Sequence, residues 1–164
     1  MKVKLKKINN SARLPVKGKE GDFCHDVWAV SEEEIAPNVW RYGLGFKYEI
    51  ERPKLFTPSE KSLLGYTDNI LDEYEISIGF KPRSSIYETG MSLVNSQGCL
   101  DEFYRGEAAA IFYHVLPKME RYHVGDKIGQ IYLEIAPKVE FEFVDEINEN
   151  TERGNGGFGS TGKQ

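Results

Sequence analysis

Residues 127–144 read KIGQIYLEIAPKVEFEFV, and the alternation of apolar and polar side chains in them indicates β-structure. The alternation fills two runs, Lys127–Ile135 and Lys138–Val144, which an Ala-Pro pair separates. A period of two places every second side chain on the same face of a strand, so each run has one apolar face to bury. We expect two strands here, one on either side of Pro137.

Short runs of the same kind recur along the chain. Alternating or β-rich segments separated by Gly, Pro, Asn and Asp are Met1–Ile8, Trp40–Ile50, Tyr74–Phe80 and Ala108–Val115. Helical spacing is weak. Its best examples are Ser31–Ala36, which has a Ser-x-x-Glu capping pattern, and a short segment near Thr57. Many short strands with little helix predict an all-β fold, either a sandwich or a barrel.

Length and composition predict a single domain. The chain has 164 residues, of which 40% are hydrophobic, and this is enough material for one core. We expect the domain over residues 1–148 and a flexible, Gly-rich C-terminal arm over residues 149–164. Residues 52–72 are polar, hold two prolines and lack sustained alternation, so we expect a surface insertion between two strands.

Charge and cysteine content exclude several classes of function. The formal net charge of -5 gives no general attraction toward nucleic-acid polymers. No apolar run approaches the roughly 20 residues that a membrane helix needs. The two cysteines lie far apart behind a polar, lysine-rich start, so we expect free thiols and a cytoplasmic protein. The three scattered histidines disfavour a zinc site.

The segment KPRSSIYE, which begins at Lys81, suits a phosphate group. Arg83 offers a planar, always charged donor, and Ser84 and Ser85 offer hydroxyl groups beside it. The same Pro-Arg-Ser-Ser sequence is also common in ordinary turns. On its own, this segment therefore leaves both interpretations open.

The segment NSQGCLDEFYRGE, which begins at Asn95, holds a candidate general base. Asn-Ser-Gln-Gly is typical of a hairpin turn, which would make Asn95 and Asp101 face each other across a narrow ribbon. A carboxylate at Asp101, next to apolar and aromatic residues, is suited to accept a proton from water. The alternative is a turn residue whose carboxylate pairs with Arg105.

Two further polar residues interrupt apolar strand patterns. Asp26 follows His25 and precedes Val27 and Trp28, and a carboxylate in this position is suited to hold Mg²⁺ through water, or to cap a loop. Gln130 interrupts the strand Lys127–Ile135, either as a ligand contact or as part of the solvated face. None of these segments names an activity by itself.

Taken in order, the segments resemble the five motifs of the trimeric dUTP pyrophosphatase (dUTPase) family. GMSLVNSQGCLDEFYRGE from Gly90 resembles the third motif, and RGNGGFGSTG from Arg153 the fifth. GDFCHDVWA from Gly21 resembles the first motif, KPRSS from Lys81 the second, and GDKIGQ from Gly125 the fourth. The resemblance spans about Ala12 to Lys163, and the third and fifth patterns together make it specific.

The resemblance implies an enzyme that hydrolyses dUTP to dUMP and pyrophosphate with the help of Mg²⁺, keeping uracil out of DNA and supplying dUMP. It also implies a distorted β jelly roll that assembles as a homotrimer with active sites shared between subunits. Carried over by position, Asp101 matches the base that activates water. Tyr104 matches the ring beneath the deoxyribose, and Asn95 with Gly98 and Leu100 matches the segment that reads uracil.

The resemblance assigns the remaining positions to the phosphates, the metal and the arm. Arg83 with Ser84 and Ser85 matches phosphate contacts, as does Gln130, and Asp26 matches the carboxylate that holds magnesium through water. In the arm, Phe158 is expected to stack on uracil. Arg153 is expected to reach the γ-phosphate with Gly159, Ser160 and Thr161 nearby. The arm is thus expected to close over an active site, that of a neighbouring subunit.

Two departures from the family pattern stand out. The fourth motif usually reads Arg-Ile-Ala-Gln, whereas this chain has Lys127, Ile128, Gly129 and Gln130. The positive charge is kept, but a bidentate contact is lost. The spacing from Asp26 to Arg83 is long, which fits the insertion over residues 52–72. Two alternatives stay open: an enzyme similar to dCTP deaminase, and a non-catalytic nucleotide-binding module on the same fold.

Overall fold

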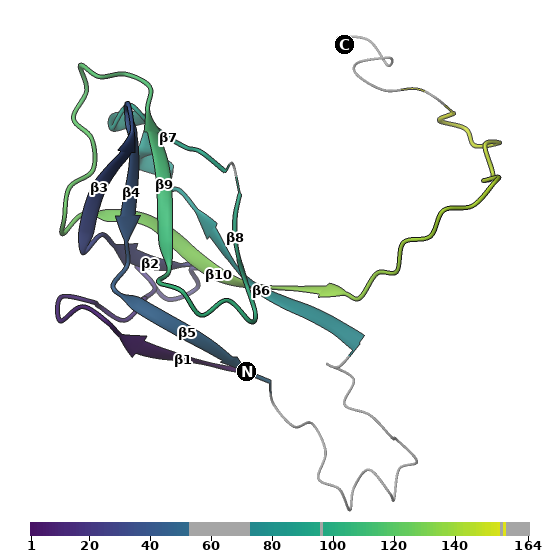
Figure 1. Cartoon of the computed structure of the whole chain (residues 1–164), viewed down its shortest axis with the longest axis horizontal. Helices are drawn as coiled ribbons and strands as arrows, with labels where there is room; N and C mark the ends of the chain where they lie inside the picture. Colours follow the sequence, from purple (N-terminus) through teal and green to yellow (C-terminus); the bar gives the residue numbers. More distant parts are fainter. Residues whose placement is uncertain (53–72, 96, 155, 157–164) are drawn as a thin grey trace, which may run out of the picture.

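Three antiparallel sheets make up the part of the chain that the computed structural model describes, namely residues 1–52, 73–95, 97–154 and 156 (Figure 1). A two-stranded ribbon joins β1 (Lys2–Lys7) to β5 (Phe46–Glu51). One four-stranded sheet, here called the β6–β10 sheet, has the order β2-β10-β6-β8. The other, the β4–β9 sheet, has the order β3-β4-β9-β7.

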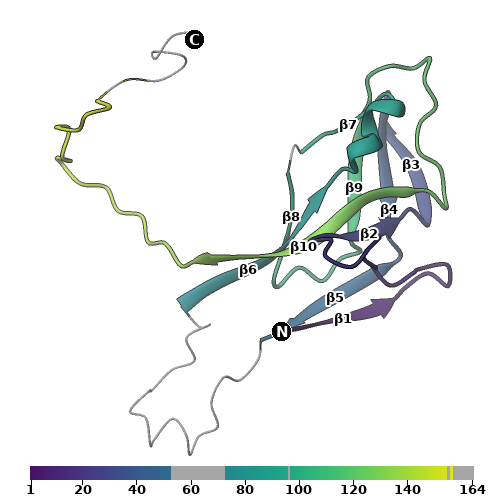
Figure 2. The same ribbon diagram turned by 180° about the vertical axis from the view of Figure 1, so that it is seen from behind.

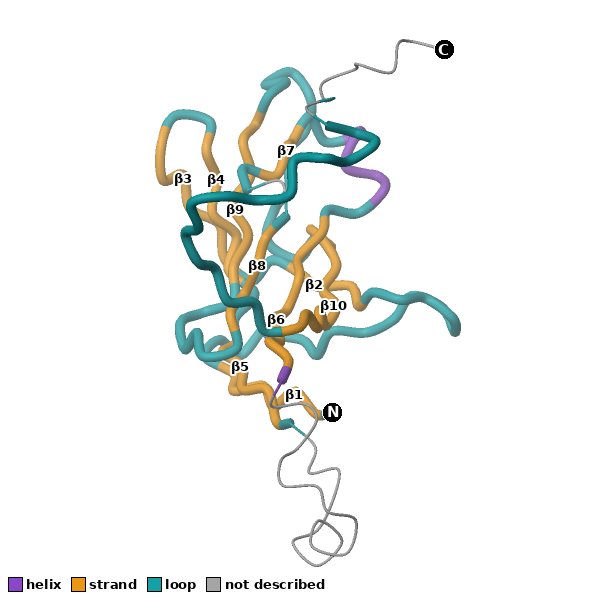
Figure 3. The backbone as a smooth tube through the Cα atoms, turned by 90° about the vertical axis from the view of Figure 1, so that its right-hand side faces the viewer, coloured by secondary structure: helices purple, strands orange, loops and turns teal. Residues whose placement is uncertain are grey.

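The strands of the two larger sheets are short, except for β10, which has 11 residues. The β6–β10 sheet consists of β2 (His25–Trp28), β10 (Lys127–Pro137), β6 (Tyr74–Lys81) and β8 (Gly98–Asp101). The β4–β9 sheet consists of β3 (Ser31–Ala36), β4 (Val39–Gly43), β9 (Ala109–His114) and β7 (Met91–Leu93). A short 3-10 helix, η2 (Ser84–Glu88), lies between β6 and β7 (Figure 3).

The two four-stranded sheets bury one common core. Tyr42 and Phe112 of the β4–β9 sheet are fully buried, as is Ile128 of the β6–β10 sheet. Phe80 packs edge-on against Phe112 across the core, with ring centroids 6.1 Å apart. The predicted all-β fold is therefore confirmed as two packed sheets. These sheets do not close into a barrel within the described residues.

The expected helix over Ser31–Ala36 is wrong, because this segment is strand β3. It pairs with β4 from Ser31 opposite Gly43 to Ala36 opposite Val39, and Asn38 makes the turn with a φ of 61°. The Glu34 side chain accepts a hydrogen bond from the backbone N–H of Asn38 at 2.9 Å, and so supports the turn rather than a helix start. Pairing with a neighbouring strand outweighs a weak local helical pattern.

The expected hairpin around Asn95 is also wrong as a paired ribbon. β7, before the turn, pairs with β9, whereas β8, after it, pairs with β6. The segment therefore crosses from one sheet to the other. This crossing places Asn95 at the border between the two layers.

The expected strand Lys138–Val144 does not form in this chain. β10 continues to Pro137, which lies opposite Tyr74, the first residue of β6. One further backbone bond runs from the Lys138 N–H to the Glu73 carbonyl at 2.9 Å. Residues 139–154 then run away from the sheets in an exposed course (Figures 1 and 2). Phe141 and Phe143 have relative exposures of 91% and 109%.

Candidate active site

The buried carboxylate of Asp26 draws together residues from three separate segments of the chain. Asp26 lies on β2 opposite Gln130 of β10, and 4% of the residue is exposed. Lys127 Nζ donates to its Oδ2 at 2.8 Å, and Gln130 Nε2 donates to its Oδ1 at 3.0 Å. Arg83 Nε lies 3.8 Å from Oδ1, just beyond the end of β6. We call these four residues the Asp26 cluster.

These neighbours keep the Asp26 carboxylate ionised. Burial would raise the pKa of Asp26, but hydrogen bonds from Lys127 and Gln130 and the charges of Lys127 and Arg83 outweigh it. The pKa therefore lies below its ordinary value. With two cations around one carboxylate, the cluster carries a net positive charge. It is suited to bind an anion with several oxygens, such as a phosphate chain.

A single carboxylate also limits the kind of metal site that this cluster can make. Within the described residues, no group of three or more His, Cys, Asp or Glu side chains is placed to hold a metal ion. Each oxygen of Asp26 has a second lone pair beside the hydrogen bond that it already accepts. The residues therefore fit an ion that keeps its water shell and takes its other ligands from phosphate, as Mg²⁺ commonly does.

The two serines after Arg83 open the short helix η2. Ser84 is exposed and Ser85 is half-buried. The backbone N–H of Ile86 donates to the Arg83 carbonyl at 3.1 Å, and this bond fixes the turn that follows the arginine. Both hydroxyl groups thus start from the same turn as the guanidinium group.

Asp101 ends β8 with a carboxylate that is open to solvent. Among the described residues its only recorded side-chain contact is the Cys99 thiol, whose sulfur lies 3.8 Å from Oδ1. The expected alternative, a pair with Arg105, does not form. Arg105 Nη1 donates instead to the backbone carbonyls of Glu102 and Tyr104, at 2.8 Å and 3.0 Å.

A buried tyrosine holds the backbone of Asp101 in place through a hydrogen bond. Tyr48 of β5 donates its hydroxyl proton to the Asp101 carbonyl, and its ring lies 6.4 Å from that of Tyr104 between centroids. Burial, with a further contribution from the Asp101 charge, raises the pKa of Tyr48 to about 12. Tyr104 itself is 43% exposed, and its hydroxyl donates to the Glu107 carbonyl at 3.2 Å.

The residues expected to read uracil lie next to Asp101. Gly98 is buried and pairs with Phe80, while Leu100 is half-buried and pairs with Ile78. Asn95 is exposed, and its amide nitrogen lies 3.6 Å from the point where a Cβ on Gly98 would stand. The tighter neighbour of this point is Cβ of Phe80, at 3.1 Å, so a side chain at position 98 would press on the core rather than on the amide.

Within one chain, the Asp26 cluster and Asp101 stand apart. Asp101 lies opposite Ser77 on β6, whereas Gln130 lies opposite Lys81. Four residues along a strand span roughly 13 Å. This distance exceeds the reach of an aspartate side chain with one bound water.

Most residues of the expected insertion, and the last residues of the expected arm, lie outside the part of the chain that the structure describes. Arg153 is exposed and donates from Nε to the Gly156 carbonyl at 3.0 Å. Phe158, Gly159, Ser160 and Thr161 lie outside the described residues, as do residues 53–72. At the near end of the insertion, Arg52 binds Glu102 through two hydrogen bonds of 2.7 Å and 2.6 Å.

Sequence reasoning did not connect two residues of this region, Lys127 and Tyr48, to the partners that they have in the fold. Lys127 makes the shorter of the two hydrogen bonds to the Asp26 carboxylate, but the two residues are 101 positions apart. In the sequence they are connected only because both belong to the motifs of the same family. Tyr48 lies in a plain alternating run, and nothing in that run connects it to Asp101.

Comparison with known proteins identifies the class. The family model described as dUTPase matches residues 56–162, and the chain therefore belongs to the dUTPase family. Among curated relatives, the deoxyuridine 5'-triphosphate nucleotidohydrolase of Clostridium kluyveri is 32% identical over 163 residues, covering 99% of each chain. That of Helicobacter pylori strain J99 is 31% identical over 165 residues, covering 99% of this chain and 97% of its own.

Solved structures share the fold. The dUTPase of Staphylococcus bacteriophage 80alpha with dUPNHPP superimposes with a TM-score of 0.68 over 99% of each chain, at 17% identity. A mutant dUTPase of phage phi11 of S. aureus, whose structure concerns the coordination of a structural Mg(II) ion, gives a TM-score of 0.63 at 13% identity. It covers 90% of this chain and 99% of its own. The expected dUTPase-like β fold is thus confirmed.

In the described part of the chain, no helix has the length and apolar character that a membrane crossing requires.

Proposed function

We propose that the protein hydrolyses dUTP to dUMP and pyrophosphate, which keeps uracil out of DNA and supplies dUMP. The observation that carries this proposal is the Asp26 cluster, in which residues of three family motifs meet around one buried carboxylate. The phosphate chain of the substrate lies against Arg83, Lys127 and Gln130. Ser84 and Ser85 add hydroxyl donors from the neighbouring turn.

Asp26 is the residue that would hold Mg²⁺, through water, beside the bound phosphate chain. When bound, the ion would withdraw charge from the phosphate groups. The contribution of the chain is to keep Asp26 ionised and the cations beside it in place.

Asp101 is the general base in this proposal. Its carboxylate is exposed and free of a cationic partner among the described residues, so it is available to accept a proton from water. Tyr48 and the Tyr104 backbone N–H both bind the Asp101 carbonyl, which fixes the position of the side chain. Attack of the resulting hydroxide on the α-phosphorus releases pyrophosphate.

The base and sugar lie on the residues around Asp101. Asn95 and the backbone of Gly98 and Leu100 read the O4 and N3 positions of uracil, and cytosine would leave these groups unpaired. The exposed Tyr104 ring packs beneath the deoxyribose, where a 2′-hydroxyl group would collide with it. These roles follow the family motif position by position.

Complete sites require more than one copy of the chain. The roughly 13 Å along β6 between the Ser77 and Lys81 positions is too far for Asp101 to serve phosphates bound in the same chain. We therefore infer that one subunit supplies the Asp26 cluster and another supplies Asp101, in the homotrimer that the resemblance to the family implies. Residues 1–148 form the domain, and residues 149–164 form an arm that brings Arg153, Phe158, Gly159, Ser160 and Thr161 to a neighbouring site in the cytoplasmic enzyme.

The proposal is tested by replacing Asp101 with Asn and measuring both binding and turnover of dUTP. We expect binding within a few-fold of the unmodified protein, and turnover lower by a factor of about 10²–10⁴, because the proton acceptor is lost. The exposed Glu49→Gln serves as the matched control. An unchanged rate in Asp101→Asn would remove Asp101 as the base.

The competing activity is tested with the unmodified protein. Incubation with dUTP and with dCTP, followed by chromatographic separation, should give dUMP and pyrophosphate from dUTP alone. Formation of dUTP and ammonia from dCTP would establish a deaminase instead. Binding of dUTP without any product would favour the non-catalytic nucleotide-binding module.

A further inference from the structure

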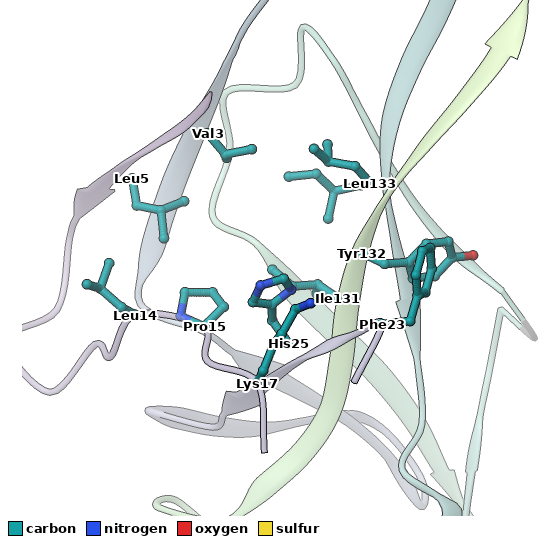
Figure 4. A pocket seen from close by; sticks show the side chains of 11 residues that line it. Val3, Leu5, Leu14, Pro15, Lys17, Phe23, His25, Ile131, Tyr132 and Leu133 are labelled. Carbon is teal, nitrogen blue, oxygen red and sulfur yellow. The ribbon is translucent and has the colours of Figure 1, made fainter. Parts of the chain in front are cut away.

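The two sides of the β1–β5 ribbon meet the rest of the molecule differently. On the β1 side, Val3 and Leu5 face β10 across a hollow of about 580 Å³ (Figure 4). On the β5 side, the ribbon contacts the end of β8, where Asp101 lies. Within the described residues, neither strand of the ribbon pairs with a strand of the two larger sheets. Side chains of β5, and of the residue that follows it, therefore tie the ribbon to this end of β8.

Arg52, the residue that follows β5, forms a two-point ion pair with Glu102. Its Nε donates to Oε1 at 2.7 Å, and its Nη2 donates to Oε2 at 2.6 Å. A guanidinium group and a carboxylate joined by two parallel hydrogen bonds are fixed in direction as well as in distance. The two side chains are only 23% and 12% exposed, so water and salt screen the pair weakly.

The pair keeps a charged carboxylate partly buried beside the candidate base. The hydrogen bonds from Arg52, with a further contribution from its charge, outweigh burial and hold the pKa of Glu102 below its ordinary value. Glu102 is therefore ionised, and Arg52 compensates its charge. Without Arg52, this negative charge would lie uncompensated one residue away from Asp101.

The pair also sets the direction of the Asp101 side chain. Asp101 is the last residue of β8, and consecutive side chains along a strand point to opposite sides. Because Glu102 is anchored inward, Asp101 is turned toward solvent. The alternation of β5 places Tyr48, which binds the Asp101 carbonyl, on the same side as Arg52. From the other direction, Arg105 donates to the Glu102 carbonyl at 2.8 Å.

We propose that Arg52 and Glu102 are positioning residues for the general base. Their ion pair holds the backbone from which the Asp101 carboxylate extends, so that the carboxylate stays aimed at the water that it activates. Both residues act through Asp101 rather than on the nucleotide. This inference rests on the proposed function for the role of Asp101, and it adds two residues to which that role gives no part.

The first test is Arg52→Met with steady-state kinetics on dUTP. We expect kcat to fall by a factor of about 10–100, because a misplacement of the order of 1 Å is costly for a reacting group. KM should stay within a few-fold, because the Tyr104 hydroxyl keeps its own bond to the Glu107 carbonyl. An unchanged kcat would overturn the proposal.

The matched control is Arg121→Met. Arg121 pairs with Glu32 of β3 at 3.2 Å, and the two side chains are 19% and 24% exposed, much as in the Arg52–Glu102 pair. This variant should unfold at a lower temperature but keep its kcat. An equal fall of kcat in both variants would show that the loss follows stability, and it would overturn the proposal.

A double-mutant cycle separates one shared role from two independent ones. Glu102→Met should lower kcat in the same way as Arg52→Met. Adding Arg52→Met to Glu102→Met should then change kcat by less than about two-fold, because the pair is already broken. Losses that multiply in the double variant would overturn a shared role.

Hydrogen exchange tests the pair without turnover. The Tyr104 N–H donates to the Asp101 carbonyl at 3.0 Å, so exchange in a peptide spanning residues 102–106 reports on the turn after Asp101. In Arg52→Met we expect about ten-fold faster exchange in this peptide, and unchanged exchange in β9 as evidence of an intact core. Unchanged exchange at the turn would overturn the proposal and leave the proposed hydrolysis intact. An unmodified protein that fails to hydrolyse dUTP would instead refute the proposed function, so the two failures are distinguishable.

Discussion

At the scale of single residues, the Asp26 cluster is the part of the site that the folded chain completes by itself. A carboxylate that is 4% exposed would be costly if unpaired. Here Lys127 and Gln130 satisfy both of its oxygens. The cluster is therefore held together before any ligand arrives, which would reduce the reorganisation needed for the proposed phosphate binding.

The lowered pKa of Asp26 gives a stability that depends on pH. A carboxyl group whose pKa is lower in the folded state stabilises fully above its unfolded pKa, near 3.8, and this stabilisation is lost as pH falls through the folded value. Asp26→Asn should therefore reduce the loss of unfolding free energy between pH 5 and pH 2. Urea unfolding across this range measures the effect.

The exposed Glu33→Gln is the control for this measurement. Glu32 and Glu102 also have lowered pKa values through Arg121 and Arg52, so part of the acid sensitivity should remain in Asp26→Asn. Identical pH dependence in Asp26→Asn and the unmodified protein would contradict the account of the cluster.

Tyr48 supplies a second prediction at the residue scale. Tyr48→Phe removes the hydrogen bond to the Asp101 carbonyl but keeps the buried ring. We expect a loss of about 0.5–1.5 kcal/mol in unfolding free energy. We also expect a several-fold lower kcat with little change in KM, because Asp101 is less well fixed. Tyr74→Phe, at a half-buried tyrosine at the start of β6, is the control, and equal kcat in all three proteins would limit Tyr48 to a structural role.

At this scale the sequence motifs name candidate residues, but not where those residues lie in the fold. The motifs identify Asp26, Arg83 and Gln130, and the fold brings these three together. Their meeting depends on the antiparallel register of β2 and β10, and no local pattern encodes that register. The arm residues from Phe158 onward lie outside the described residues, so their roles stay predictions.

At the scale of strands, the departure at Gly129 from the usual fourth motif has a packing reason. A Cβ at this position would overlap the ring of Phe80 and come within 2.8 Å of the Lys81 carbonyl oxygen. Phe80 is 2% exposed and belongs to the core. Glycine therefore lets β10 and β6 approach around a large ring, which alanine would not allow.

Gly129→Ala should consequently destabilise the fold by about 1–3 kcal/mol, as expected for overpacking. Thermal unfolding measures this loss. Phe80→Leu in the Gly129→Ala background should recover part of it, because the smaller side chain makes room, and a double-mutant cycle isolates the coupling. Additive effects of the two changes would show that the ring and the added methyl group do not meet.

Strands with one buried face could be predicted from the sequence. Strands that form only because they pair with a neighbour could not. β5 alternates buried and exposed residues at every position, and β10 alternates over part of its length, so their patterns are visible in the sequence. β3 is an edge strand with mostly exposed side chains, and its pairing with β4 is not visible in a local pattern. The crossing between β7 and β8 resembles a hairpin locally, because turn residues do not specify which sheet follows.

At the scale of the whole molecule, shared sites predict complementation between inactive variants. Asp101→Asn lacks the base, and Arg83→Ala lacks a phosphate contact. Mixed and refolded in equal amounts, they should regain about a quarter of the unmodified activity, because that fraction of sites combines two intact halves. Steady-state assays before and after mixing measure this, and each variant refolded alone is the control. No gain on mixing would place the complete site within one chain.

The gap between Asp101 and the Asp26 cluster also sets how activity responds to the amount of protein. In the proposed arrangement, a newly made chain has both halves of the chemistry but cannot use them on one substrate, so it would be inert until it meets other copies. At low expression, output should therefore rise more steeply than the number of chains. A cell that makes little of this protein would have almost no activity rather than a proportionate share.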